Sequence, residues 1–217
     1  RLRGVAEAAG FRLAAGGPAV PLDLYGTATD LANASTSLAA LSATSVSSNG
    51  GNIVITLTQN GLNVIDLTVA DGKTVNGITF DVAPGVVPTG LIVNVFGNDL
   101  TFNGGTYAVP SGLSNGSVLY NFDNATALTL TSLAWDGSLL APLASVDFVT
   151  GDINGALMAA DFVGGGEFHE APLTLTLPPY TTTASSGGTP SPEPASLALL
   201  AGGLVGLGVA GARRTRR

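Results

Sequence analysis

The groups of this chain that could take part in catalysis are few. Its single histidine, His169, stands between Phe168 and Glu170. A histidine can serve as a general base for a serine nucleophile, with an aspartate to orient it. The sequence carries no G-x-S-x-G elbow, no H-E-x-x-H motif, no P-loop and no second histidine for a zinc site. We therefore predict no catalytic residue and no bound cofactor.

Carboxylates gather toward the end of the body, where oxygen ligands could hold Ca²⁺. These acidic residues are Asp147, Asp152, Asp161, Glu167 and Glu170. Their spacing lacks the regular alternation of an EF-hand loop, so we favour surface acids at strand ends and predict no metal site. The chain has no cysteine, which removes disulfides and thiolate ligands as possibilities.

The C-terminus combines three features in order. Pro192, Glu193 and Pro194 precede an uncharged run of 18 residues from Ala195 to Ala212. As a helix this run would be about 27 Å long, enough to cross the hydrocarbon core of a bilayer. A basic cluster follows, made of Arg213, Arg214, Arg216 and Arg217. Because arginines hold their end of a span in the cytoplasm, we predict a single transmembrane helix that leaves the body outside.

This tail resembles the PEP-CTERM sorting signal, in which a Pro-Glu-Pro motif, a span and a basic end follow one another. The resemblance implies that an exosortase recognises the tail and cleaves it. It also implies a Gram-negative bacterium that makes extracellular polysaccharide. The protein would be anchored in the inner membrane before processing and then reach the cell surface or matrix. A plain C-terminal membrane anchor is the alternative.

The body is strongly acidic. Between Leu13 and Pro190, Lys73 is the only basic residue besides His169, against 13 acidic residues, so the formal net charge there is −12. Such a body repels the phosphates of nucleic acids, and we exclude them as partners. The stretch from Arg1 to Val20 lacks the apolar run of a secretory signal. Because an exported protein needs such a signal, we expect that the N-terminal part is truncated.

The body reads as short strands joined by tight turns. One helix is predicted within Leu24–Ser45, where leucines recur at helical spacing and Thr29 or Asp30 could cap the start. Strands are predicted where aliphatic residues and Thr alternate between Gly, Asn, Asp and Pro. The predicted strands are Ile53–Thr58, Asn63–Val69, Gly77–Val82, Gly90–Phe96 and Asp99–Phe102.

The second half contains a repeat of Asx, Gly, a small residue and two aliphatic residues. It begins at Asn115, Asp136 and Asn154. Asx-Gly provides the positive φ of a tight turn, and the small residue permits close approach of backbones. Units recurring about every 20 residues favour a β-solenoid, in which each coil buries its apolar face on the next. Ordinary hairpins in a β-sandwich are the alternative.

Residues 20 to 170 are similar to the choice-of-anchor A domain. The similar segments are Leu62–Val64, Val93–Gly97, Val118–Phe122, Gly137–Pro142, Ile153–Gly155 and Gly166–His169. The resemblance implies a bacterial surface domain, regarded as adhesive, with no established ligand and with varied C-terminal anchors. It places His169 in a closing strand. The segments beginning at Gly137 and Asn154 also look like the coils of bacterial ice-binding β-solenoids.

Two further patterns could form a contact surface. Thr-Leu-Thr occurs at 56–58, 129–131 and 174–176, and strand alternation puts both threonines of each triplet on one face. Rows of threonine could order water or bind sugars, although threonine is also an ordinary exposed strand residue. Trp135 and Tyr120 lie next to the repeat turns. An exposed tryptophan could stack on a sugar, but we favour packing at a corner of the coil.

We therefore predict an all-β, β-solenoid or β-helix-like domain with a short helix, a flexible linker and a C-terminal transmembrane helix. The predicted organisation is an unassigned segment 1–20, a choice-of-anchor A-like domain 21–178, a Thr/Ser/Gly/Pro linker 179–191 and a sorting tail 192–217. The predicted function is structural or adhesive, with an exosortase, the inner membrane and extracellular polysaccharide or cell surfaces as partners. An ice-binding or other ligand-binding solenoid is the alternative, and a polysaccharide-acting enzyme is a more distant one.

Overall fold

A computed structural model describes residues 12–13, 20–21, 28–44, 46–47 and 53–178. The chain divides into two compact units, 1–182 and 183–217, and every described residue belongs to the first. The described part is mostly β, with one α-helix, α1 (Ala28–Ala39), and a single 3-10 turn, η1 (Asn115–Ser117). The prediction of one short helix inside 24–45 is confirmed for this stretch.

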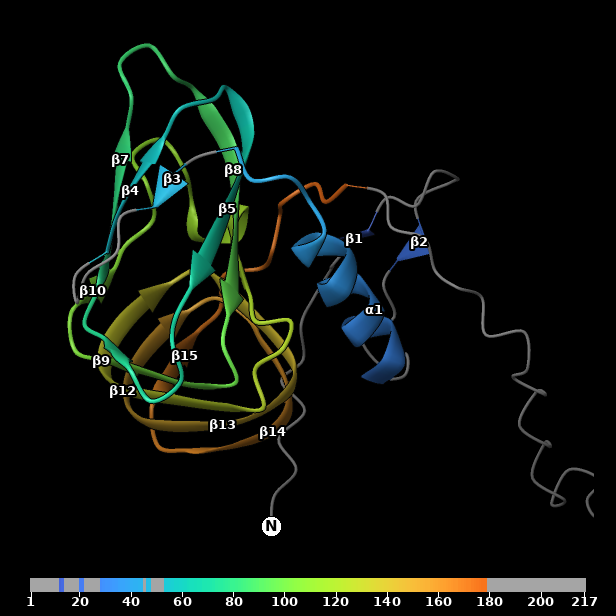
Figure 1. The fold of residues 1–217 in the computed structure, drawn as a ribbon, viewed down its shortest axis with the longest axis vertical. Helices are drawn as coiled ribbons and strands as arrows, with labels where there is room; N and C mark the ends of the chain where they lie inside the picture. The colour runs from blue at the N-terminus through green and yellow to red at the C-terminus, as the bar shows by residue number, and fades with distance from the viewer. Residues whose placement is uncertain (1–11, 14–19, 22–27, 45, 48–52, 179–217) are drawn as a thin grey trace, which may run out of the picture. The chain divides into compact units, whose positions relative to one another are not determined.

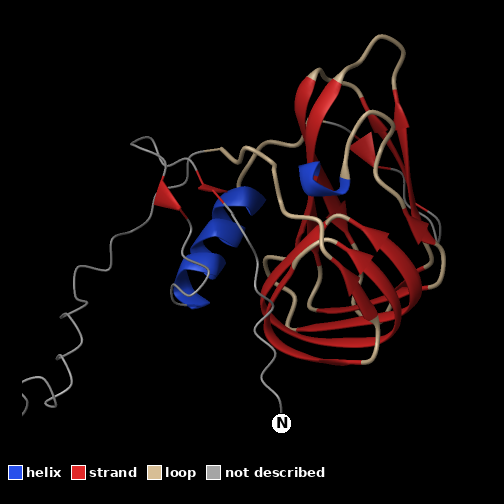
Figure 2. Ribbon diagram, turned by 180° about the vertical axis from the view of Figure 1, so that it is seen from behind, coloured by secondary structure: helices blue, strands red, loops and turns tan. Residues whose placement is uncertain are grey.

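The main feature is a curled parallel sheet that forms a half-barrel (Figure 2). Its strands are β5 (Gly61–Thr68), β6 (Thr74–Val75), β8 (Pro88–Phe96), β9 (Asp99–Asn103), β10 (Thr106–Tyr107), β11 (Val118–Asn121), β12 (Ala127–Asp136), β13 (Ser138–Asn154), β14 (Leu157–Gly164) and β15 (Glu167–His169). A smaller sheet contains β3 (Val46–Ser47), β4 (Ile53–Leu57) and β7 (Ile78–Val82), and β1 (Arg12–Leu13) pairs with β2 (Val20–Pro21). All five predicted strands are present, and none of their ends differs from the prediction by more than two residues.

The chain winds so that each stretch lies beside the stretch one turn later. β5 pairs in parallel with β8, β8 with β11 and β11 with the start of β13. The start of β13 pairs in the same way with the start of β14. β6, β9, β12 and the later parts of β13 and β14 form a second parallel series. β13 is 17 residues long, and its curved path runs beside β12 and β14 (Figure 1). Side-chain hydrogen bonds between adjacent turns join residues 28 and 27 positions apart early in the chain, and 21 and 18 apart later.

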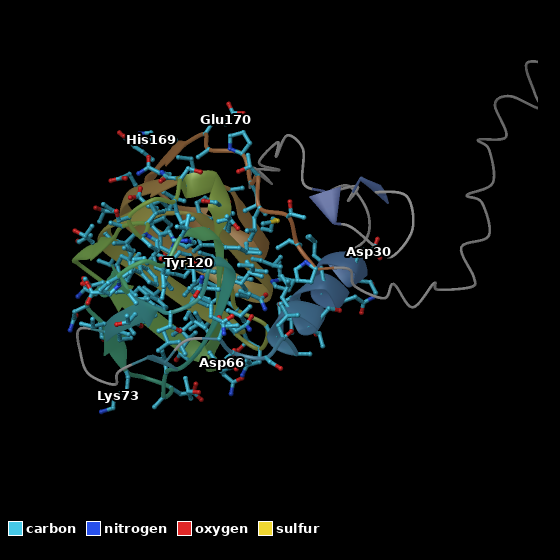
Figure 3. All side chains as sticks on the ribbon, turned by 90° about the horizontal axis from the view of Figure 1, so that it is seen from above. Asp30, Asp66, Lys73, Tyr120, His169 and Glu170 are labelled. Carbon is cyan, nitrogen blue, oxygen red and sulfur yellow. The ribbon has the colours of Figure 1, made fainter. Side chains whose placement is uncertain are left out.

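Strand alternation fills the inside of these turns with apolar side chains. In the first series Ile65, Val93, Tyr120 and Leu139 occupy successive inward positions and are fully buried. Trp135 lies against this column, 4.6 Å from Tyr120 and 4.5 Å from Tyr107 between ring centroids. Tyr120 lies among densely packed side chains, whereas Lys73, His169 and Glu170 lie at the periphery (Figure 3). The predicted packing of Trp135 and Tyr120 is confirmed, and neither ring is open to stack on a sugar.

The outer side of the first series is covered by α1 and by a strap, residues 173–177. Ala34 and Leu38 of α1 and the buried leucines of the strap pack on Ile92, Leu119, Leu140 and Met158. Polar bonds fix the helix in place. Asn121 Nδ2 donates to the carbonyl of Ser35 at 2.9 Å and to Asn94 Oδ1 at 3.0 Å. Asn94 Nδ2 in turn donates at 3.0 Å to the carbonyl of Leu38 in the last turn of the helix, which also accepts from the Leu41 N–H at 3.2 Å.

The Asx-Gly repeat is a structural repeat, but its glycines have two different roles. Gly137 has φ +112°, as predicted for a turn glycine. The prediction of positive φ is wrong for Gly116 and Gly155, which do not adopt it. A Cβ at Gly155 would overlap the carbonyl of Gly137 in the preceding turn, and one at Gly116 would overlap the carbonyl of Pro172. These two positions need glycine for the close approach of another backbone.

The predicted sorting tail, 192–217, and the linker, 179–191, lie outside the described residues. The same holds for most of segment 1–20. Within the described ranges, α1 falls short of the length and apolarity needed to cross a membrane. The transmembrane helix therefore stays a prediction from sequence.

Candidate contact surface

The second series of strands presents a column of hydroxyl groups outward. Thr74 on β6 pairs with Thr101 on β9, and Thr101 pairs with Thr129 on β12. The column continues with Asp147 on β13 and Val163 on β14. Their neighbours in sequence point inward, because Val75, Leu100, Leu128 and Phe148 are buried. Neighbouring members of the column lie about 4.8 Å apart, the spacing of strands in a sheet.

A second column runs beside the first, two residues earlier on each strand. It consists of Asp99, Ala127, Ser145 and Asp161. Asp99, Ser145 and Asp161 are exposed, and Ala127 is half-buried. Together the two columns form an outward grid of hydroxyls and carboxylates, hereafter the Thr/Asp face. Since the strands beneath pack on the aromatic core, the face is held rigidly and can offer several polar groups at once to an extended partner.

The Thr-Leu-Thr triplets do not combine into one surface. In each triplet the leucine is buried and the two threonines point outward, as alternation predicts. However, Thr129 stacks on Thr101 and Asp147, whereas Thr56 pairs with Asp81 on β7, and Thr174 and Thr176 lie on the strap. Thr74 and Thr101 complete the column instead. Sequence reasoning missed them because they stand 27 and 28 positions before their partners, outside the shorter repeat of the second half.

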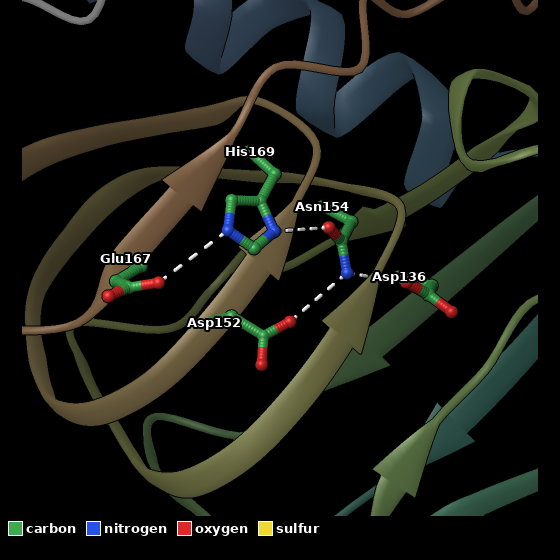
Figure 4. A network of polar contacts seen from close by, with 5 residues as sticks. All are labelled: Asp136, Asp152, Asn154, Glu167 and His169. Carbon is green, nitrogen blue, oxygen red and sulfur yellow. Dashed lines mark hydrogen bonds and ion pairs between the residues drawn. The ribbon is translucent and has the colours of Figure 1, made fainter.

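A ladder of polar side chains links the later turns at a different corner (Figure 4). Asp136 Oδ1 accepts hydrogen bonds from Asn115 Nδ2 at 3.2 Å and from Asn154 Nδ2 at 2.9 Å. Asn154 Nδ2 also donates to Asp152 Oδ2 at 3.1 Å. The three Asx residues of the sequence repeat are thus brought into direct contact across successive turns.

His169 ends this ladder on β15, so its predicted place in a closing strand is confirmed. Because two carboxylates hold the Asn154 amide nitrogen, Asn154 Oδ1 faces His169 Nδ1 at 2.8 Å, and Nδ1 carries the hydrogen. Nε2 lies 3.6 Å from Glu167 Oε2 in an exposed pair. The described contacts of the ring are therefore those of a structural ladder, and no described serine hydroxyl hydrogen-bonds to it.

The acids singled out in the sequence are distributed over two surfaces. Asp147 and Asp161 lie on the Thr/Asp face, whereas Asp152 and Glu167 pair with each other beside the ladder. Glu170 follows β15 and is exposed. Over the described ranges, His, Asp and Glu side chains form no group of three or more that could hold a metal ion. The sorting residues Pro192, Glu193 and Pro194 and the four tail arginines lie outside those ranges.

Comparison with models of protein families assigns the chain to a family. The family model described as "Putative Ice-binding-like adhesive domain" matches residues 5–170, which include all of the curled sheet. The chain belongs to this family. Membership in the ice-binding-like adhesive family supports a surface adhesive role and fits loosely with the resemblance to the choice-of-anchor A domain. Neither the curated proteins nor the solved structures contain a match to the chain.

Proposed function

We propose that this chain is an exported cell-surface or matrix protein whose described domain is a passive adhesive module. The observation that carries the proposal is the family match together with the rigid, outward Thr/Asp face. The polar ladder around His169 joins successive turns of the chain. This arrangement favours a structural role for His169 over a catalytic one.

The test is retention of the purified chain on extracellular polysaccharide, measured together with release of sugar fragments from the same material. We expect weak retention by each molecule, stronger retention when many copies share one bead, and no release of fragments. His169→Ala should bind as the wild type does once its folding has been checked. Release of fragments that disappears in a folded His169→Ala variant would replace the adhesive role with an enzymatic one.

The finer architecture belongs to the same proposal. Parallel pairing of each stretch with the one a full turn later is the arrangement of a β-solenoid, with coils of about 27 residues followed by coils of about 18. We assign the domain to the choice-of-anchor A type on the resemblance of residues 20–170. An experimental structure with antiparallel hairpins in place of the parallel pairs β8–β11 and β12–β13 would exclude both assignments.

Sorting by an exosortase rests on the tail sequence. An exosortase would recognise Pro192-Glu193-Pro194 while the apolar run holds the precursor in the inner membrane. Replacing these three residues by alanine should leave an uncleaved, membrane-held precursor. Mass spectrometry of the mature protein would decide the point, because a mature form that still ends at Arg217 excludes processing.

Ice binding is the second candidate, favoured by one observation. Thr74, Thr101 and Thr129 form a regular row of hydroxyls at strand spacing. The row is short, since Asp147 and Val163 continue it. Thermal hysteresis of the purified chain, lost in Thr101→Val/Thr129→Val, would support ice as the ligand. A freezing point equal to that of an inert protein at the same concentration would exclude it.

A further inference from the structure

The Thr/Asp face is acidic, and its charge bears on which polymer it could bind. The inference drawn from it rests on the adhesive function proposed above. Asp99, Asp147 and Asp161 are exposed on the face. Asp99 shares its strand with Thr101, and Asp147 shares its strand with Ser145 and pairs across to Thr129. Lys73, next to the first threonine of the column, is the only lysine of the whole chain. An anionic polymer would meet carboxylates here with little basic charge to offset them.

The chemistry of the face also separates neutral from cationic sugars. The aromatic rings Trp135, Tyr107 and Tyr120 are buried in the core, so they cannot serve as a stacking platform for a sugar ring. At the outward positions of the two columns the structure places hydroxyl, carboxylate and small aliphatic side chains. Recognition here therefore depends on hydrogen bonds and charge. Hydroxyls can bind the hydroxyls of any sugar, but the carboxylates gain an ion pair only from a cationic one.

The face is open to a long ligand. α1 and the strap pack on the outside of the first series of strands, and no described helix packs on the second. The outward positions of the first column run across five successive strands from β6 to β14, with Thr101 and Thr129 half-buried and the others exposed, so one extended polymer could contact several turns at once. Each contact is weak because it is exposed to solvent and salt, and many of them together give attachment.

We propose that the Thr/Asp face binds a cationic amino-sugar polymer, with ammonium groups paired to Asp99, Asp147 and Asp161 and sugar hydroxyls bonded to Thr101 and Thr129. This occupant is favoured by charge complementarity with a body that carries 13 acidic residues and one lysine between Leu13 and Pro190. Neutral and anionic polysaccharides are the competing occupants that the experiment separates.

The experiment measures retention of the full chain on a β-linked glucosamine polymer with free amines, on its fully N-acetylated form and on a polyuronate. We expect retention on the free-amine polymer that weakens with salt, and little on the other two. Asp147→Asn/Asp161→Asn should weaken retention by about three- to tenfold. The matched control Asp81→Asn/Glu170→Gln makes the same change in net charge away from the face and should leave retention within about twofold.

Two results would overturn the proposal. Equal losses in both double variants would mean that overall charge, not the face, attracts the polymer. Stronger retention on the acetylated polymer or the polyuronate would assign a different ligand class. In that second case, a loss of retention confined to the Thr101→Val/Thr129→Val variant would still support the adhesive function. If the chain were retained neither on any of the polymers nor on isolated matrix, the adhesive function would be excluded as well.

Discussion

Two buried tyrosines provide a matched pair at the scale of single residues. Tyr107 and Tyr120 are both fully buried, but Tyr107 Oη donates to the carbonyl of Val75 at 2.9 Å, whereas the Tyr120 hydroxyl has no described partner. Tyr107→Phe should lower the free energy of unfolding by about 1 kcal/mol, because the Val75 carbonyl loses its donor. Tyr120→Phe should leave it unchanged or raise it. Urea unfolding of both variants checks this, and a loss in Tyr120→Phe as large as in Tyr107→Phe would contradict it.

The same two tyrosines predict how stability depends on alkaline pH. Burial raises the pKa of both phenols above their ordinary value of 10.0, and the charge of Asp136 raises the pKa of Tyr120 further. The folded state therefore keeps protons that the unfolded state loses above pH 10. Stability should be fully present below that pH and should fall as the pH rises beyond it. A urea midpoint that stays constant from pH 9 to 11.5 would be inconsistent with this.

Gly137 tests the backbone requirement of the Asx-Gly repeat. Its φ is +112°, and an added Cβ would lie 3.1 Å from the Val118 side chain and 3.2 Å from Tyr120. Gly137→Ala should therefore destabilise the domain by about 1–3 kcal/mol. Gly165→Ala is the control, since its nearest neighbour, the Val149 carbonyl, is 3.9 Å away. Equal urea midpoints for the two variants would show that a side chain at position 137 causes no strain.

Residue roles could be predicted from sequence only where they follow from local pattern. The Asx-Gly pattern located the ladder of Asn115, Asp136 and Asn154, although the positive φ it implies occurs only at Gly137. The glycine at 155 is needed because the backbone of Gly137 in the previous turn passes close by, which depends on how the turns stack. Thr74 and Thr101 were missed for the same reason, since their partners are distant in sequence.

At the scale of elements, α1 is attached by both apolar and polar contacts. Asn121 is fully buried and bonds to Ser35 through its amide nitrogen and oxygen, at 2.9 and 2.6 Å. Asn121→Ala should lower the free energy of unfolding by about 1–3 kcal/mol, because it removes the acceptor of the buried Ser35 hydroxyl and the side-chain donor to the Ser35 carbonyl. Thr36→Ala, which removes only an exposed bond to Asp123, should cost less than about 0.5 kcal/mol. Urea unfolding followed by circular dichroism compares them, and similar losses would argue against a buried polar clamp.

Most elements were predictable because alternation and turn residues are local signals. The five strands of the first half and the helix were found, but the pairing of those strands was not. The intervals of 27 and 28 residues between paired strands contain different turns and loops, so no short repeat marks them. Only the shorter intervals of the second half bring similar residues back at a regular spacing. The covering of one face by α1 and the strap has no sequence signal, because it depends on packing between distant segments.

At the scale of the whole molecule, the described domain has one covered side and one polar, outward side. The first series of strands carries α1 and the strap, while the second presents the Thr/Asp face. This asymmetry suits a module that is attached at one place and makes contact at another. The family match supports an adhesive role for such a module, and the tail sequence supplies the proposed means of attachment.

The most direct test of this account is attachment of beads that carry many copies of the chain to extracellular matrix, measured under flow. Thr101→Arg/Thr129→Arg places bulky charges in the centre of the Thr/Asp face, and Thr79→Arg/Thr176→Arg places the same charges at two exposed positions outside it. We expect that beads with the first variant detach at clearly lower flow, while beads with the second stay attached like the wild type. Equal attachment of both folded variants would contradict the claim that this face makes the contact.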